Sequence, residues 1–187
     1  NKIRLLNLFG FIMSNNSSSE PSQQDMNKLE NLYKSSQFNT LENKAEELLK
    51  KHSKNVNLHN ILGVSLQVQG KLKESLKIFE KIIKLQPNFY LAHYNMGNVL
   101  KQSLDLKGAK TCYEKCINFS PTFIDAHISL GLILLDLNKL DESANVFKMA
   151  LKLKPEDGNL HRHLSSVTKY SEKNSHIRDM EKIISND

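Results

Sequence analysis

A fixed repeat period constrains this chain more than any other feature. Three residue types recur at one spacing, about 34 residues, in three separate series. The series are Gly63, Gly97 and Gly131; Pro87, Pro121 and Pro155; and His59, His93, His127 and His161. Coincident series indicate one supersecondary unit repeated along the chain, with neighbouring units stacking to bury a continuous core. We therefore expect the 187 residues to form a stack of short repeats and not one or two ordinary domains.

Each repeat has the pattern of two helices joined by a short break. The three clear repeats are 56–89, 90–123 and 124–157. Within each one, apolar residues recur at helical spacing before and after the break. The glycine lies in the middle of the first helix, where it costs about 1 kcal/mol relative to alanine, so its recurrence predicts that the partner helix passes too close for a Cβ atom. The second helix of each repeat contains a large aromatic residue, which is Phe79, Tyr113 or Phe147. A proline follows this helix and is expected to end it. The pattern predicts an all-α fold.

The middle repeat resembles the tetratricopeptide repeat family at its signature positions. The matching residues are the segment His93-Tyr-Asn-Met-Gly97, Ala109, Tyr113, Cys116 and Pro121. The chain departs from the family in having histidine where tryptophan is common, and Ser75 and Ser143 where alanine is preferred. The resemblance implies a right-handed superhelical solenoid of antiparallel helix pairs that acts as a protein-binding scaffold.

The repeat pattern weakens on both sides of the clear repeats. Residues 25–55 keep the spacing of a degenerate repeat without its glycine and proline, and residues 158–187 fit a partial or capping hairpin. Residues 1–24 are expected to be disordered. We interpret 1–12 as upstream read-through, with a degenerate export signal as the alternative. Apolar residues recur almost to Asp187, which is unusual for a natural terminus.

The composition favours a soluble cytoplasmic protein. Hydrophobic residues make up 39% of the chain and charged residues 25%. The net charge of +6 comes almost entirely from lysine, whereas arginine is the residue suited to bidentate phosphate recognition, so we expect neither a nucleic-acid nor a membrane partner. Cys112 and Cys116 lie four apart on one helix face, and we expect them to be core residues in a reducing compartment.

No motif in the sequence predicts catalysis, a cofactor or a metal site. Phosphate-binding glycine loops and hydrolase or metalloprotease motifs do not occur in it. The recurring histidines lie on successive packed helices, about 8–10 Å apart. One zinc ion, which needs nitrogens at about 2.0–2.1 Å, cannot bridge them. His161 and His163 are two apart and face different sides of a helix. We therefore expect the recurring histidines to be half-buried packing residues.

In tetratricopeptide proteins the first helix of each hairpin lines the concave groove, so these helices supply the candidate binding residues. The residues are Asn57, Asn60, Val64, Gln67, Leu91, Tyr94, Asn95, Asn98, Lys101, Asp125, Ile128, Ser129 and Leu132. Their mixture of amide, aromatic and apolar groups suits an extended peptide or a partner domain. A clamp for a C-terminal carboxylate, known in some family members, is not expected, because Val64, Asp125 and Ser129 stand where it needs asparagine or a cation. The alternative is that some of these residues only solvate an unused face.

A second hypothesis treats the chain as the recognition arm of a longer enzyme. Residues 160–170 and 176–183 resemble the junction in bacterial proteins that join tetratricopeptide repeats to a sulfotransferase domain. The resemblance implies a catalytic domain in cis, beyond this chain. No catalytic residue of that family can be assigned here, so we expect the chain itself to be inactive as an enzyme.

Overall fold

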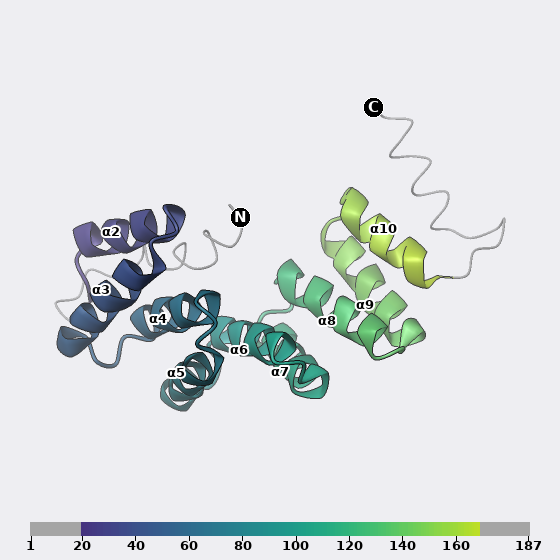
Figure 1. Ribbon diagram of the computed structural model, residues 1–187. Coiled ribbons are helices and arrows are strands. Elements are labelled where there is room, and N and C mark those ends of the chain that lie inside the picture. The colour runs from purple at the N-terminus through teal and green to yellow at the C-terminus, as the bar shows by residue number, and fades with distance from the viewer. Residues whose placement is uncertain (1–19, 169–187) are drawn as a thin grey trace. The chain divides into compact units, whose positions relative to one another are not determined.

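The described part of the chain is entirely helical. In the computed structural model, residues 20–168 are described, and they form nine α-helices and no strand (Figure 1). The helices are α2 (Gln23–Lys34), α3 (Phe38–Lys51), α4 (Val56–Val68), α5 (Leu72–Leu85), α6 (Tyr90–Gln102), α7 (Leu106–Phe119), α8 (Ile124–Asp136), α9 (Leu140–Leu153) and α10 (Gly158–Val167). None of these helices is both long enough and apolar enough to cross a membrane. The second helix expected within 175–184 lies outside the described residues.

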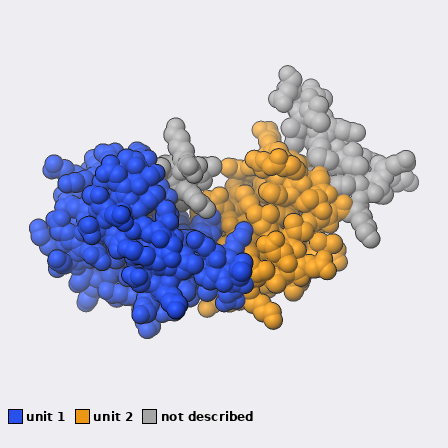
Figure 2. Space-filling model, viewed as in Figure 1, with its two compact units in different colours: residues 1–105 blue, residues 106–187 orange. Residues whose placement is uncertain are grey.

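The helices pack in sequence order within two compact units, residues 1–105 and 106–187 (Figure 2). In unit 1, α3 packs on α2 and α4, and α5 packs on α4 and α6. In unit 2, α8 packs on α7 and α9, and α9 packs on α10. Consecutive antiparallel helix pairs are the architecture that the repeat period predicts.

The helix α2 begins at Gln23, slightly before the hairpin boundary expected from the sequence. Ser22 explains the difference, because its Oγ accepts a hydrogen bond from the Asp25 backbone N–H at 3.1 Å and donates one to the Asp25 carboxylate at 2.7 Å. This arrangement is a side-chain N-cap, which satisfies a backbone donor in the first turn of a helix. Asn55 and Asp157 cap α4 and α10 through the same kind of side-chain acceptor.

The breaks between paired helices follow the same repeat period. Each break contains one residue with a left-handed backbone: Ser36 (φ 58°), Gly70 (φ 77°), Leu104 (φ 63°) and Asn138 (φ 57°). The residue after each donates its backbone N–H to the carbonyl five positions earlier, as from Lys71 to Leu66 at 3.0 Å. These bonds define the Schellman motif that ends helices. Glycine adopts this conformation without strain, but only one of the four positions has it.

Each recurring glycine of the first and third clear repeats faces an aromatic ring of the partner helix. A Cβ atom added to Gly63 would lie 2.7 Å from Cε1 of Phe79, and one added to Gly131 would lie 2.5 Å from Cε1 of Phe147. Both rings are fully buried. The close approach predicted from the sequence is therefore confirmed at these two glycines, and the contacting group is a side-chain ring.

The serines that replace the family's alanine make a hydrogen bond across the helix pair. Ser75 Oγ donates to the Gly63 carbonyl oxygen at 2.7 Å, and Ser143 Oγ donates to the Gly131 carbonyl oxygen at 2.8 Å. Both serines are fully buried, so each hydroxyl needs such a partner. Ala109 is the residue at this place in the middle repeat.

The hairpin of α2 and α3 shares a buried apolar core with α4 and is also joined to it by polar contacts. Ser65 Oγ on α4 donates to the Phe38 carbonyl oxygen at 2.9 Å. Lys71, in the break after α4, pairs with the Glu42 carboxylate on α3 at 2.8 Å. The Phe38 ring in turn meets Tyr33 edge-on, with ring centroids 5.8 Å apart. Both aromatic rings also pack against the apolar core of α2, α3 and α4.

Candidate functional site

The recurring histidines are packing residues that close the link between successive repeats. Each is 2–6% exposed, more deeply buried than the half-buried state that we expected. In each one, ring Nε2 lies within hydrogen-bond distance of the backbone carbonyl oxygen six residues earlier. The pairs are His59 with Ser53 (2.9 Å), His93 with Pro87 (2.8 Å), His127 with Pro121 (2.8 Å) and His161 with Pro155 (2.6 Å). Their rings therefore hold the connecting loops.

The electrostatics of His59 follow from this burial. A carbonyl oxygen only accepts, so Nε2 of the neutral ring must be the donor. The Nδ1 atom of His59 is buried and has no hydrogen-bond partner among residues 20–168. Burial lowers the pKa of His59 below its ordinary value, and the nearby charge of Lys81 lowers it further, against the opposing effect of the Ser53 carbonyl. His59 is therefore held in its neutral form.

The other predicted core polar groups also have packing roles. Cys112 and Cys116 are buried on one face of α7. His163 points away from His161, as its spacing predicts, and stacks on Phe147 with ring centroids 5.3 Å apart. Across residues 20–168, His, Cys, Asp and Glu side chains do not gather in groups of three that could hold a metal ion.

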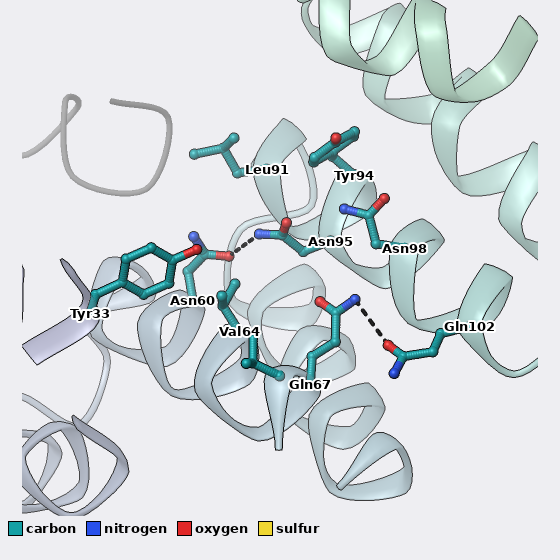
Figure 3. Close-up of a pocket in the computed structure, with 10 residues that line it drawn as sticks. Tyr33, Asn60, Val64, Gln67, Leu91, Tyr94, Asn95, Asn98 and Gln102 are labelled. Atoms are coloured by element: carbon teal, nitrogen blue, oxygen red, sulfur yellow. Dashed lines mark hydrogen bonds between the residues drawn. The ribbon is translucent and has the colours of Figure 1, made fainter. Parts of the chain in front are cut away.

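A pocket of about 280 Å³ lies in unit 1, along the first helices of three successive hairpins (Figure 3). It is lined by one residue of α2 and by residues of α4 and α6. The lining residues are Tyr33, Asn60, Val64, Gln67, Val68, Leu91, Tyr94, Asn95, Asn98 and Gln102. Five of the ten are amides and two are tyrosines, and none has a charged side chain. The pocket is therefore neutral, with many hydrogen-bonding groups.

The floor of the pocket contains a pair of amides that joins α4 to α6. Asn95 Nδ2 donates to Asn60 Oδ1 at 2.8 Å, and both residues are buried. A second amide pair, Gln67 and Gln102, is more exposed and meets at 3.5 Å, which is long for a hydrogen bond. The buried pair thus defines the geometry of the pocket floor.

Seven of the thirteen residues predicted for the groove line this pocket. They are Asn60, Val64, Gln67, Leu91, Tyr94, Asn95 and Asn98. Asn57, in the first turn of α4, lines a different pocket with Glu20, Lys54 and Gln86. Lys101 is half-buried on α6 and is not part of the lining.

The four remaining predicted residues lie on α8 in unit 2. Asp125, Ile128, Ser129 and Leu132 are all half-buried there. Ile128 and Leu132 pack against the apolar cluster that includes Leu160 and Leu164 of α10. Part of their surface therefore serves the core of unit 2.

Three lining residues were missed by sequence reasoning. Val68 lies one turn beyond Val64, and Gln102 lies one turn beyond Asn98, so extending the i, i+4 spacing along each helix finds both. Tyr33 belongs to the degenerate hairpin, in which no glycine or proline fixes the register. Tyr33 lies one repeat period, 34 residues, before Gln67, which lies on the first helix of the following hairpin. This spacing could have identified Tyr33 as a lining residue.

Comparison with known proteins reports the same repeats. The family model described as "Tetratricopeptide repeat" matches residues 56–89, 90–123 and 124–157, more than half of the chain. No curated protein matches the sequence.

Solved structures share the fold at low sequence identity. A MamA structure from Desulfovibrio magneticus RS-1 has a TM-score of 0.70 and 20% identity, over 87% of this chain and 93% of that one. The structure of YrrB, described as a TPR protein with an unusual peptide-binding site, has a TM-score of 0.64 and 18% identity, over 90% of this chain and 87% of that one. At these identities the likeness is one of fold.

These comparisons lend no support to the sulfotransferase resemblance. Of the two segments on which it rests, the first is described only up to residue 168, and its residues 160–167 belong to α10 (Gly158–Val167), which packs on α9 within unit 2. The second segment, 176–183, lies outside the described residues, as do residues 1–19, for which we expected disorder or read-through.

Proposed function

The chain belongs to the tetratricopeptide repeat family, and from this premise we propose that the pocket in unit 1 binds an extended peptide segment of a partner protein. The observation that supports the proposal most directly is the pocket itself, with buried amides on its floor and tyrosines among its lining residues. Amide side chains can donate to and accept from a peptide backbone, and tyrosine supplies contact area at a low entropic cost.

The shape and composition of the pocket suit a chain segment better than a compact metabolite. Its length follows three successive first helices, from Tyr33 on α2 to Gln102 on α6 (Figure 3). Apolar contact comes from Val64 and Leu91, which lie between the amides. Extended peptides bind through main-chain hydrogen bonds with pockets for alternate side chains, and the lining offers both elements. That the four predicted residues of α8 also contact the peptide stays a prediction, and the peptide-binding experiment below tests it.

Peptide display against the full chain tests the proposal. We expect a random peptide library to yield binders whose dissociation constants, measured by fluorescence polarisation, rise about tenfold in Asn98→Ala, because one or two hydrogen bonds to the peptide are lost. Asn27→Ala is the matched control, since Asn27 is an exposed amide on α2 outside the pocket. The dissociation constants measured with Asp125→Ala show whether α8 contributes to peptide binding.

Two outcomes contradict the proposal. One is a selection that yields no binder. The other is a set of binders for which Asn98→Ala and Asn27→Ala have the same effect, since binding then takes place elsewhere. Melting temperatures of both variants, compared with the unmodified chain, separate a loss of contact from a loss of folding.

A further inference from the structure

We propose that Leu104, in the break after α6, contacts an apolar side chain of the bound segment where that segment leaves the pocket. Leu104 would then select peptides that carry an apolar residue just beyond the part held by the pocket. This inference rests on the proposed function and adds a specificity-determining residue outside the lining. It follows from the exposure of the Leu104 side chain, its left-handed backbone and its place two residues after a lining residue.

The side chain of Leu104 has little contact with the rest of the protein. It is 84% exposed, whereas the next most exposed large apolar side chain in residues 20–168, that of Val68, is 50% exposed. Scattered apolar residues on a surface are usual, but most of them still cover part of the fold beneath them. Packing within the described chain therefore gives no reason for a leucine at this position.

The backbone of Leu104 also disfavours a leucine. Its φ of 63° places the residue in the left-handed region, which is unfavourable for a side chain of this kind. The equivalent positions of the other three breaks hold smaller residues, namely Ser36, Gly70 and Asn138. A residue that is both strained and exposed is a reason to look for a role in binding.

Hydrogen bonds hold this part of the backbone in place. The Leu104 backbone N–H donates to the Lys101 carbonyl oxygen at 3.0 Å. The next residue, Asp105, donates its backbone N–H to the Leu100 carbonyl oxygen at 2.9 Å. These bonds end α6, so the Leu104 side chain stays on the surface as long as the helix end is formed. A side chain presented from a fixed backbone loses less conformational entropy when a partner covers it.

Leu104 lies close to one end of the pocket. Gln102, the last residue of α6, lines the pocket, and two residues of chain span at most about 7 Å. Gln67, in the last turn of α4, meets Gln102 at 3.5 Å, so the C-terminal turns of both helices lie at this end (Figure 3). An extended peptide advances about 3.3 Å per residue. Two or three further peptide residues therefore reach Leu104.

The chemistry of this end favours an apolar partner group. Val68 follows Gln67 at the end of α4, lines the pocket and is half exposed. Neither Val68 nor Leu104 has a side-chain group that forms hydrogen bonds, so each gains from burial only by losing contact with water. An aliphatic or aromatic side chain of the peptide provides that burial, whereas a charged side chain would lose hydration without a partner.

Peptides selected on the full chain test the inference through Leu104→Asn. Asparagine tolerates a left-handed backbone, as at Asn138, so this variant keeps the helix end and removes the apolar side chain. We expect the dissociation constants, measured by fluorescence polarisation, to rise about tenfold, while the melting temperature stays the same or rises. Leu140→Asn is the matched control, because Leu140 is an exposed leucine of α9 in unit 2, and it should leave the dissociation constants unchanged.

A complementary experiment identifies the partner group on the peptide. In a selected peptide, each apolar residue is replaced in turn by serine. We expect one replacement to weaken binding about tenfold on the unmodified chain and to weaken it little further on Leu104→Asn, because the two side chains contact each other. The same replacement should stay costly on Asn98→Ala, which removes a pocket amide and leaves Leu104 in place.

A conservative variant separates the apolar contact from the shape of the break. Leu104→Met keeps a flexible apolar side chain of similar size, so it should bind the selected peptides within about twofold of the unmodified chain. If Leu104→Met binds as weakly as Leu104→Asn, the apolar contact is not the cause and the inference is wrong.

The remaining outcomes distinguish this inference from the proposed function. Peptides that bind Leu104→Asn as tightly as the unmodified chain, and are weakened by Asn98→Ala, overturn the inference and leave the proposed function standing. Self-association of the peptide-free chain that Leu104→Asn abolishes, measured by sedimentation, also overturns it, because a second copy then covers Leu104. A selection that yields no binder overturns both.

Discussion

The first clear repeat lies in unit 1 and the third in unit 2, and their internal contacts are nearly the same. In both, a glycine faces a buried phenylalanine ring, a serine hydroxyl bonds the glycine carbonyl, and a histidine bonds the carbonyl six residues before it. The Ser–carbonyl distances, 2.7 and 2.8 Å, are nearly equal. The helix pair is therefore one unit of packing that was repeated with its contacts intact.

The outward faces of the two repeats differ. Asn60, Val64 and Gln67 of α4 line the pocket, whereas the positions two periods later on α8 are Ile128, Leu132 and Leu135. Two amides and a valine in unit 1 thus correspond to three aliphatic residues in unit 2. Packing contacts within the helix pair restrict the residue types that can occupy its interior positions. The outward positions have fewer such contacts and can change more freely. Differences between repeats in what they bind therefore arise at the outward positions.

The substitutions with the largest expected effect test whether the glycine–phenylalanine contacts of the first and third clear repeats are equivalent. Gly63→Ala and Gly131→Ala should each lower the free energy of unfolding by about 1–3 kcal/mol, because the new Cβ atom meets a buried ring that cannot move away. The loss should be at least as large at Gly131, where the distance is shorter. Urea denaturation measures both.

A second substitution isolates the cause. In a Phe147→Leu background the ring is gone, and Gly131→Ala should become neutral or stabilising, because alanine favours a helix by about 1 kcal/mol over glycine. If Gly131→Ala stays as damaging as before, the ring is not the reason that glycine recurs.

The breaks between helices allow a smaller test. Leu104 adopts a left-handed backbone with φ 63° and is 84% exposed, so Leu104→Gly should raise the free energy of unfolding by about 1 kcal/mol through relief of strain. Asn138→Gly should change it by only a few tenths of a kcal/mol, since asparagine tolerates this conformation. Equal effects at the two positions would mean that the residue type in the break is unimportant.

The smallest expected effect concerns pH. Because burial holds the pKa of His59 below its ordinary value of 6.5, the unfolded chain takes up a proton on this residue before the folded chain does. The contribution of neutral His59 to the free energy of unfolding is therefore fully present above about pH 6.5. This contribution is lost as the pH falls through the folded-state pKa of His59. His59→Gln should reduce the slope of unfolding free energy against pH over that range; an unchanged slope contradicts the assignment.

Much of the fold follows from spacing alone. Gly63 and Phe79 are far apart in the sequence, but their recurrence at the repeat period identified both as interior, and the structure places them in contact. The partners of the histidines could not be predicted in the same way. Three of the four partner residues are the recurring prolines, but the bonding atom is a backbone carbonyl oxygen, which every residue has. The residue type therefore does not identify the bond, and Ser53 serves His59 as Pro87 serves His93.

Most of the site was predicted on the helices whose register was certain. Seven lining residues on α4 and α6 were found because the glycine ladder fixes which face of each helix points outward, although Val68 and Gln102, one turn further along, were missed. Tyr33 was missed because the hairpin of α2 and α3 lacks that ladder, so its outward face could not be assigned. Asn57 was predicted from its helical position, but the first turn of α4 opens toward a different pocket.

The contacts of Tyr33 bear on how binding is regulated. This residue forms one wall of the pocket, and it lies on α2, which packs chiefly on a single neighbour, α3. A helix covered chiefly by one neighbour opens locally more often than a helix inside the core does. Only molecules with α2 in place have a complete pocket, so the apparent dissociation constant equals the intrinsic one divided by the closed fraction. A substitution of Met26 or Leu29, which anchor α2 in the apolar core shared with α3 and α4, can therefore tune affinity without touching the ligand.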